Sequence, residues 1–195
     1  MPFEIRKGFP ETERVRAADL FWKAFSGKLG KILSPEHKAL ALLRDLLDPA
    51  YAISAVDQNG RLLGLAGFKT SQGSLTKGGL TDIARIYGWP GALWRGLFLS
   101  LLERPVKPGV FLMDGIFVDA AARGQGVGTA LLQGVETEAR AQGLTRVRLD
   151  VIDTNPRARA LYERAGFEAV GEEKAGIFSG LFGFSSATQM EKRLA

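Results

Sequence analysis

Residues 114–129 read Asp-Gly-Ile-Phe-Val-Asp-Ala-Ala-Ala-Arg-Gly-Gln-Gly-Val-Gly-Thr. An apolar strand leads into a turn with glycines at 124, 126 and 128, and the turn opens a helix. The first amides of a helix lack intrahelical acceptors and carry a partial positive charge, so they bind phosphate oxygens well. Glycine also lets the backbone approach a ligand closely. The stretch therefore predicts a cradle for a pyrophosphate.

The apolar patterns on either side of this turn predict one α/β domain with a mixed sheet, since no repeat or long linker divides the 195 residues. A strand, a glycine turn, a helix and a strand form a βαβ unit, whose two strands are parallel. The patterns predict strands over 3–6, 52–56, 61–68, 110–118, 147–151, 167–173 and 187–194, and helices over 11–25, 34–47, 126–142 and 156–165. Residues 81–103 are expected to form two short helices, broken at Gly88-Trp89-Pro90.

Each expected helix has an apolar face. Gly27 and Gly30 are expected to end the first helix, and Ser34 to cap the second. The expected buried faces are Val15, Ala18, Trp22 and Phe25; Leu40, Leu43 and Leu47; Trp94, Leu97, Phe98 and Leu101; and Val127, Leu131, Val135 and Ala139.

Composition excludes several kinds of site. The chain has no cysteine, which excludes disulfides, thiolate catalysis and cysteine metal sites. Its one histidine, His37, follows a helix-start signal and reads as a surface residue, and we expect no metal site. The net charge of +5 favours anionic partners, but the basic residues are scattered, so a nucleic-acid arm is not indicated. The N-terminal residues do not resemble a signal peptide and no apolar segment is long enough for a membrane span, so a cytoplasmic location is expected.

Two motifs carry the chemistry. The glycine turn fits neither a Walker loop nor a Rossmann fingerprint; it reads Arg-x-x-Gly-x-Gly from Arg123 to Gly128. Residues 155–167 contain Asn-x-x-Ala-x-x-Leu-Tyr-x-x-x-Gly-Phe, which places Asn155, Ala158 and Tyr162 on one helix face. Both motifs follow strands of the same βαβ unit, so they meet at one edge of the sheet.

Together the motifs resemble the two signatures of the GCN5-related N-acetyltransferase superfamily, closely over residues 110–167. The resemblance implies one acetyltransferase domain over residues 1–195, with helices on both faces of a mixed sheet that splays between two parallel strands. Residues 110–167 would form the acetyl-CoA-binding core, 73–105 a helical insert and 175–186 a loop rich in Phe and Gly.

The resemblance also implies acetyl-CoA as the cosubstrate and assigns residues to it. The backbone of Ile116, Phe117 and Val118 would pair with the pantetheine arm, which Asn155 would also bond. Tyr162 would donate a proton to the departing thiolate, and no covalent acyl-enzyme is needed. The pyrophosphate would bind at Arg123, Gly124, Gln125, Gly126, Val127, Gly128 and Thr129, and Ala158 belongs to the same site.

Asp114 is the candidate general base, because it stands where many family members have a glutamate. Asp114 could act as the general base through one water. Alternatively, it is a partly solvated strand carboxylate, or a carboxylate that only orients the amine. Asp119 reads as a turn residue, and Asp150 as structural or substrate-facing. Arg157 and Arg159 lie on a solvated helix face or contact the coenzyme A 3′-phosphate.

The acceptor would be a primary amine of a small molecule or peptide, held by the first two helices, the insert and the loop 176–184. The apolar residues of that loop line an acceptor pocket, cap the core or form a homodimer surface; they are Ile177, Phe178, Leu181, Phe182 and Phe184. Neither nucleic acid nor membrane is an expected partner. The competing hypothesis is an acyl-CoA sensor or scaffold of the same fold without turnover, which predicts tight acetyl-CoA binding and no acetylated amine.

Overall fold

The computed structural model describes residues 2–194 and shows a mixed sheet in the order β1-β2-β3-β5-β6-β8-β7, with a short strand β4 beside β3. All seven expected strands are present. Their bounds are β1 (Phe3–Lys7), β2 (Ala52–Asp57), β3 (Leu62–Thr70), β4 (Gly73–Ser74), β5 (Val110–Val118), β6 (Arg146–Ile152), β7 (Glu168–Lys174) and β8 (Ser186–Arg193).

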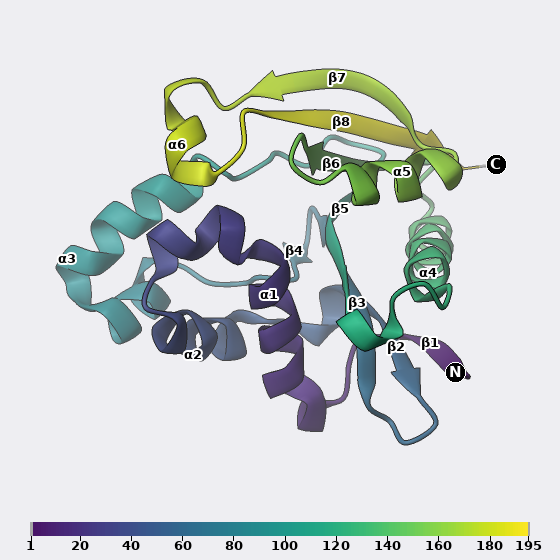
Figure 1. Ribbon diagram of the computed structural model, residues 1–195, viewed down its shortest axis with the longest axis horizontal. Coiled ribbons are helices and arrows are strands. Elements are labelled where there is room, and N and C mark those ends of the chain that lie inside the picture. The colour runs from purple at the N-terminus through teal and green to yellow at the C-terminus, as the bar shows by residue number, and fades with distance from the viewer. Residues whose placement is uncertain (1, 195) are drawn as a thin grey trace.

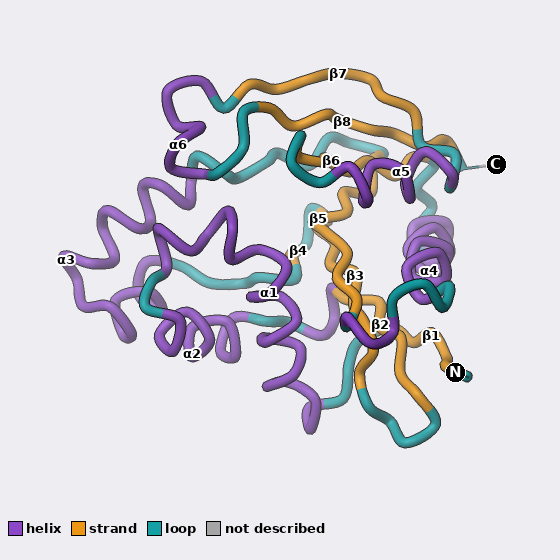
Figure 2. The backbone as a smooth tube through the Cα atoms, in the orientation of Figure 1, coloured by secondary structure: helices purple, strands orange, loops and turns teal. Residues whose placement is uncertain are grey.

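Helices cover both faces of the sheet (Figures 1 and 2). One group gathers on one side of β5, and α4 and α5 lie on the other. The helices are α1 (Arg14–Leu33), α2 (Glu36–Leu46), α3 (Leu80–Ser100), α4 (Val127–Ala141), α5 (Pro156–Arg164) and the short α6 (Ser179–Phe182). The expected face of α4 is buried: Val127, Leu131, Val135 and Ala139 pack with β3, β5 and β6.

The sheet opens between β5 and β6. These strands are parallel, as predicted, but they pair only where residues 110–112 meet residues 146–148. Beyond this point β5 continues beside β3, whereas β6 continues beside β8. In Figure 1, β6, β7 and β8 cross the top of the molecule while β3 and β5 run downward. One edge of β5 from residue 113 onward therefore has no strand partner among the described residues.

A β-bulge in β5 sets the orientation of Asp114. Gly67 pairs with Gly115, and the next residue, Phe68, pairs with Met113, so Asp114 has no partner in β3. A bulge changes the face on which the following side chains lie. Met113 accordingly packs on the α4 side of the sheet, whereas Phe117 packs on the α1 side.

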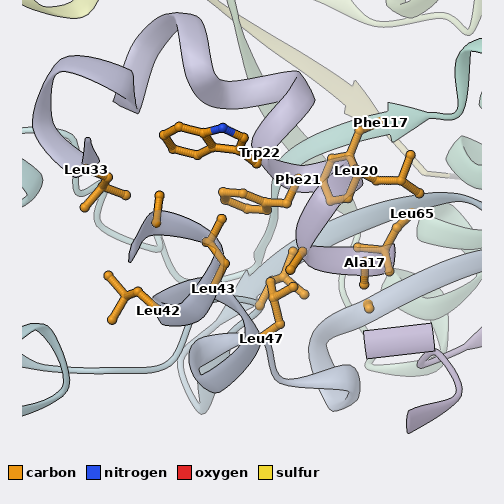
Figure 3. Packing of buried hydrophobic residues seen from close by; sticks show 14 of the residues in the cluster. Ala17, Leu20, Phe21, Trp22, Leu33, Leu42, Leu43, Leu47, Leu65 and Phe117 are labelled. Atoms are coloured by element: carbon orange, nitrogen blue, oxygen red, sulfur yellow. The ribbon is translucent and has the colours of Figure 1, made fainter. Parts of the chain in front are cut away.

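The α1 side of the sheet has its own core, shown in Figure 3 with side chains from α1, α2, β3 and β5. The rings of Phe21, Phe25 and Phe117 contact one another there. Phe25 also explains Gly115, because a Cβ at that position would lie 2.5 Å from the Phe25 Cζ atom.

The first helix is longer than predicted. Gly27 and Gly30 do not end α1, which continues to Leu33. Each interior glycine costs about 1 kcal/mol relative to alanine, and the burial of Ile32 and Leu33 in the last turn offsets this cost. Ser34 is not the cap of α2: its hydroxyl donates back to the Gly30 carbonyl, and Pro35 occupies the N-cap.

Two expected apolar faces were wrong in part. Val15 on α1 is 50% exposed, and the buried face of that helix is instead formed by residues such as Ala17, Ala18 and Phe21. The helical insert is α3, which kinks at Gly88 as expected. However, Leu97 is 63% exposed, and Trp94 and Leu101 are also exposed; the buried residues of α3 are instead Ile83 and Ala92.

The described residues contain no helix that combines the length and apolarity needed to cross a membrane.

Candidate active site

A cavity of about 420 Å³ lies between the helices α1, α2 and α3 and the bulged part of β5. This volume is within the range of small-molecule sites. Leucine and phenylalanine side chains form most of its wall, and its charged lining residues are Lys28, Lys69, Glu103, Arg104 and Asp114. The cavity therefore has an apolar wall and a polar end beside β5.

Asp114 stands at the polar end. The bulge points it to the α1 side, where the residue remains exposed to the open cavity although many protein atoms surround its carboxylate. This desolvation raises the pKa of Asp114 to about 6, against the opposing influence of Lys69, Arg104 and Lys28. A carboxylate with such a pKa is charged at neutral pH and can still accept and release a proton.

Lys28 on α1 faces the same end of the cavity. Its partial burial, reinforced by repulsion from Arg104, lowers the pKa of the ammonium to about 8. No carboxylate lies within ion-pair distance of it in the described chain, and its recorded side-chain contact is the ring of Phe184, 5.6 Å from Nζ to the centroid. Lys28 is therefore a half-buried cation without an ion pair among the described residues, although Asp150 and Asp114 act on it from a longer distance.

Arg104 and Asp150 form the floor of this region. The Asp150 side chain is fully buried, and its Oδ2 lies 2.6 Å from Arg104 Nη1 in an ion pair without hydrogen-bond alignment. Arg148 Nε lies 3.4 Å from the other carboxylate oxygen. Lys69 Nζ donates to the Arg104 carbonyl at 3.3 Å. Asp150 is thus a structural anchor for Arg104. Of the two roles that the sequence left open for Asp150, structural or substrate-facing, the buried side chain supports the structural one.

We expect Arg104→Leu to lower the free energy of unfolding by about 1–3 kcal/mol, because Asp150 would remain buried with only the longer contact to Arg148. Urea denaturation at pH 7.5 measures this. Arg157→Leu is the matched control, since Arg157 is exposed and has no recorded side-chain contact. Equal stability of the two variants would mean that the Arg104–Asp150 pair contributes nothing.

The glycine turn has the geometry expected of an anion cradle. Gly124 and Gly126 have φ of +74° and +82°, and a Cβ at either position would meet no protein atom within 4 Å. The first bonded turn of α4 is closed by Ala130, whose amide donates to the Gly126 carbonyl at 3.0 Å. The amides of Val127, Gly128 and Thr129 consequently have no acceptor within residues 2–194 and are available to phosphate oxygens.

The side chains that flank this turn support its shape. Arg123 Nε donates to the Val118 carbonyl at 3.3 Å, which ties the turn to the end of β5. Asp119 is a turn residue, as expected: its Oδ1 accepts from the Ala121 amide, and it pairs with Arg16. Gln125 Nε2 donates to the Ala121 carbonyl at 2.8 Å.

Replacing Gly126 with alanine is expected to raise the KM for acetyl-CoA by about tenfold or more, because the new Cβ would occupy the space beside the free amides and alanine disfavours positive φ. Gly143→Ala is the control: Gly143 has φ +71° at the other end of the same helix, with nothing within 4 Å of its Cβ. Steady-state kinetics with varied acetyl-CoA compares them. An equal KM for the two variants would argue against a cofactor site at the turn.

The second motif places its residues on α5. Asn155 is the N-cap of this helix, and its Oδ1 accepts from the Ala158 amide at 3.2 Å, which leaves the side-chain NH₂ group for other partners. Tyr162 is 4% exposed and contacts the Phe167 ring, with centroids 6.0 Å apart. Burial raises the pKa of Tyr162, so the phenol stays protonated at neutral pH.

Coenzyme A fits these features on geometric grounds. Along Ile116, Phe117 and Val118, the edge of β5 that faces away from β3 has no strand partner, and the free amides of α4 follow after the glycine turn. An extended amide-bearing arm can pair with such an edge. In the described part of the chain, no cluster of three or more His, Cys, Asp or Glu has the arrangement of a metal site.

The structure resolves part of the acceptor side that the sequence left open. The first two helices and the insert line the cavity with Asp114, but the loop 176–184 does not. Phe182 and Phe184 are buried against α1 and cap the core, whereas Ile177 is 92% exposed. Arg159 pairs with Glu163 on the surface of α5, at 2.9 Å.

Three cations beside Asp114 were missed in the sequence: Lys28, Lys69 and Arg104. They come from α1, β3 and the segment before β5, far apart along the chain. No sequence motif links these three residues. Apart from the scattered basic residues of the whole chain, nothing in the sequence indicated that they lie together.

The chain matches the family model described as "Acetyltransferase (GNAT) family" over residues 15–167. Over 70 residues it is 36% identical to the aminoglycoside N(6')-acetyltransferase type 1 of Klebsiella pneumoniae, and the matched segment covers 35% of each protein. The chain thus spans about a third of the length of that relative.

Solved structures share the fold over nearly the whole chain. An N-acetyltransferase from Staphylococcus aureus Mu50 superposes with a TM-score of 0.66 at 15% identity, covering 97% of this chain and 100% of that one. A phosphinothricin acetyltransferase from Sinorhizobium meliloti, in complex with AcCoA, gives a TM-score of 0.61 at 17% identity, covering 100% and 90%. Taken with the family match, which extends over most of the sequence, these likenesses lead to one conclusion: the protein belongs to the acetyltransferase (GNAT) family.

Proposed function

We propose that the protein is an acetyl-CoA-dependent N-acetyltransferase that acts on a primary amine bound in the cavity beside Asp114. The observation that carries this proposal is the continuity of β5. At its bulge, β5 places Asp114 at the cavity. Beyond the bulge, one edge of the same strand has no strand partner, and the chain then continues through the glycine turn to the free amides of α4.

Acetyl-CoA supplies the acetyl group as a thioester, so that the amine nitrogen forms a bond to the acetyl carbon while the carbon–sulfur bond breaks. The amine must be neutral to attack, and Asp114 receives the proton that the acceptor ammonium loses, directly or through one water. Unpaired amides on the β5 edge would stabilise the negative charge that develops on the carbonyl oxygen.

Tyr162 would donate a proton to the thiolate sulfur, and the second proton that the amine nitrogen loses as the amide forms would return to the tyrosinate through water. Burial holds the phenol in its protonated form, and the same apolar surroundings disfavour a charged thiolate that departs beside it. Proton transfer from the phenol therefore relieves an unfavourable charge. Asn155 can bond the pantetheine arm through its free NH₂ group while its oxygen caps α5.

A thiol-release assay with acetyl-CoA and a panel of amines tests this function, with mass spectrometry of the acetylated product. The panel includes kanamycin, because one relative is named as an aminoglycoside acetyltransferase. The proposal expects release of coenzyme A in equal amount to acetylated amine. Tight acetyl-CoA binding by calorimetry without any product across the panel would instead support a sensor of the same fold.

A further inference from the structure

The large uncharged side chains of the cavity wall away from β5 are aliphatic or aromatic. They come from three helices and the β3–α3 segment, and they include Phe21, Leu29, Leu42, Leu46, Leu75 and Leu99. Ser74, Thr76 and Ser100 add a few hydroxyl groups to this wall, but most of the surface that a bulky ligand would contact is apolar, and burying polar groups without partners is costly. The body of the acceptor is therefore apolar.

The polar end of the cavity has a different character. Three cations, Lys28, Lys69 and Arg104, act on Asp114 there. Arg104 is neutralised by Asp150 at 2.6 Å, but Lys28 has neither a hydrogen bond nor an ion pair in the described residues. A half-buried ammonium gains most from a carboxylate brought by a ligand.

We propose that the acceptor is a zwitterionic α-amino acid with a large apolar side chain, whose carboxylate pairs with Lys28, whose amine lies beside Asp114 and whose side chain fills the leucine-lined wall. This inference rests on the proposed function and specifies its substrate. The amino and carboxylate groups of an α-amino acid are adjacent, and Lys28 and Asp114 line the same cavity.

A polycationic acceptor is a poor fit to the same charges. Several ammonium groups would need several carboxylates, whereas the cavity lining offers Asp114 and the exposed Glu103 alone against three cations. A plain alkylamine would fit the apolar wall but would leave Lys28 without a partner. The three acceptor classes are therefore separable by experiment.

The experiment compares kcat/KM for matched acceptors: L-leucine, L-phenylalanine, L-leucinamide, isoamylamine and kanamycin. Leucinamide and isoamylamine keep the apolar body and lack the carboxylate. We expect the two amino acids to exceed both by about tenfold or more, as a charge-assisted contact warrants, and kanamycin to be the poorest. Acetyl-CoA binding is measured in parallel by calorimetry.

Lys28→Met tests the assigned contact, and Lys23→Met is its matched control, on an exposed turn of the same helix and outside the cavity lining. The Lys28 variant is expected to raise the KM for L-leucine by about tenfold and to reduce the preference for L-leucine over leucinamide accordingly. The Lys23 variant should keep that preference. Circular dichroism and acetyl-CoA affinity show whether each variant is folded.

Higher activity with isoamylamine, leucinamide or kanamycin than with the amino acids would overturn the acceptor class and leave the acetyltransferase function standing. Binding of acetyl-CoA without turnover of any acceptor would also overturn the proposed acceptor class. Absence of acetyl-CoA binding would instead remove the proposed function itself. A Lys28→Met enzyme that retains the full preference for L-leucine would overturn the role of Lys28.

Discussion

Tyr162→Phe is expected to lower kcat for acetyl transfer by about 10²- to 10⁴-fold, the usual contribution of a positioned acid. The phenyl ring keeps the packing of the buried residue against Phe167, so the fold and the KM for acetyl-CoA should change little. Only the hydroxyl proton is lost, and with it the means of neutralising the leaving thiolate.

Stopped assays of thiol release at saturating acetyl-CoA measure this effect. Tyr51→Phe is the matched control, because Tyr51 also packs edge-on against a phenylalanine, Phe68, but from a position outside the cavity and α5. A Tyr162→Phe enzyme within about twofold of the unmodified enzyme would show that the sulfur obtains its proton from another group, such as water.

Asp114→Asn is expected to reduce kcat/KM by about 10²- to 10⁴-fold at pH 7.5, because the amide cannot accept the proton of the acceptor amine. The pH profile gives a more specific readout. In the unmodified enzyme, activity should fall as the pH drops through about 6, where Asp114 becomes protonated. The variant should lack this acidic limb. A retained limb would assign the base to another group.

The same substitution is expected to preserve or raise stability above neutral pH. The pKa of Asp114 is raised from 3.8 to about 6 in the folded protein, so between these values the folded state binds more protons than the unfolded state. Stability therefore falls as the pH rises through this window. Asparagine removes the desolvated charge, so the Tm of the variant relative to the unmodified protein should be higher at pH 7.5 than at pH 4. The opposite trend would contradict the desolvation of Asp114.

Local patterns in the sequence were sufficient to predict the glycine turn and the start of α5. The turn at Gly124 and Gly126 and the start of α5 at Asn155 depend on residues adjacent in sequence, and positive φ and side-chain capping are local requirements. The splay between β5 and β6 followed from the family resemblance, since strand pairing is not a local property. The assigned roles of Asp114 and Tyr162 stay predictions until the variants are measured.

The acceptor half could not be predicted in the same way. The bulge at Asp114 depends on the register between β3 and β5, which no single segment specifies. Lys28 lines the same cavity as Asp114 only because α1 continues through Gly27 and packs over the sheet, and glycine propensity alone favoured ending the helix there. Tertiary burial of Ile32 and Leu33 outweighed that local preference.

The most direct test of the central claim is thiol release from acetyl-CoA with L-leucine or L-phenylalanine, with the acetylated product identified by mass spectrometry. We expect one coenzyme A to be released for each N-acetylated amine, at a rate that depends on Tyr162 and Asp114. Failure to bind acetyl-CoA, or turnover unaffected by replacing both residues, would contradict it.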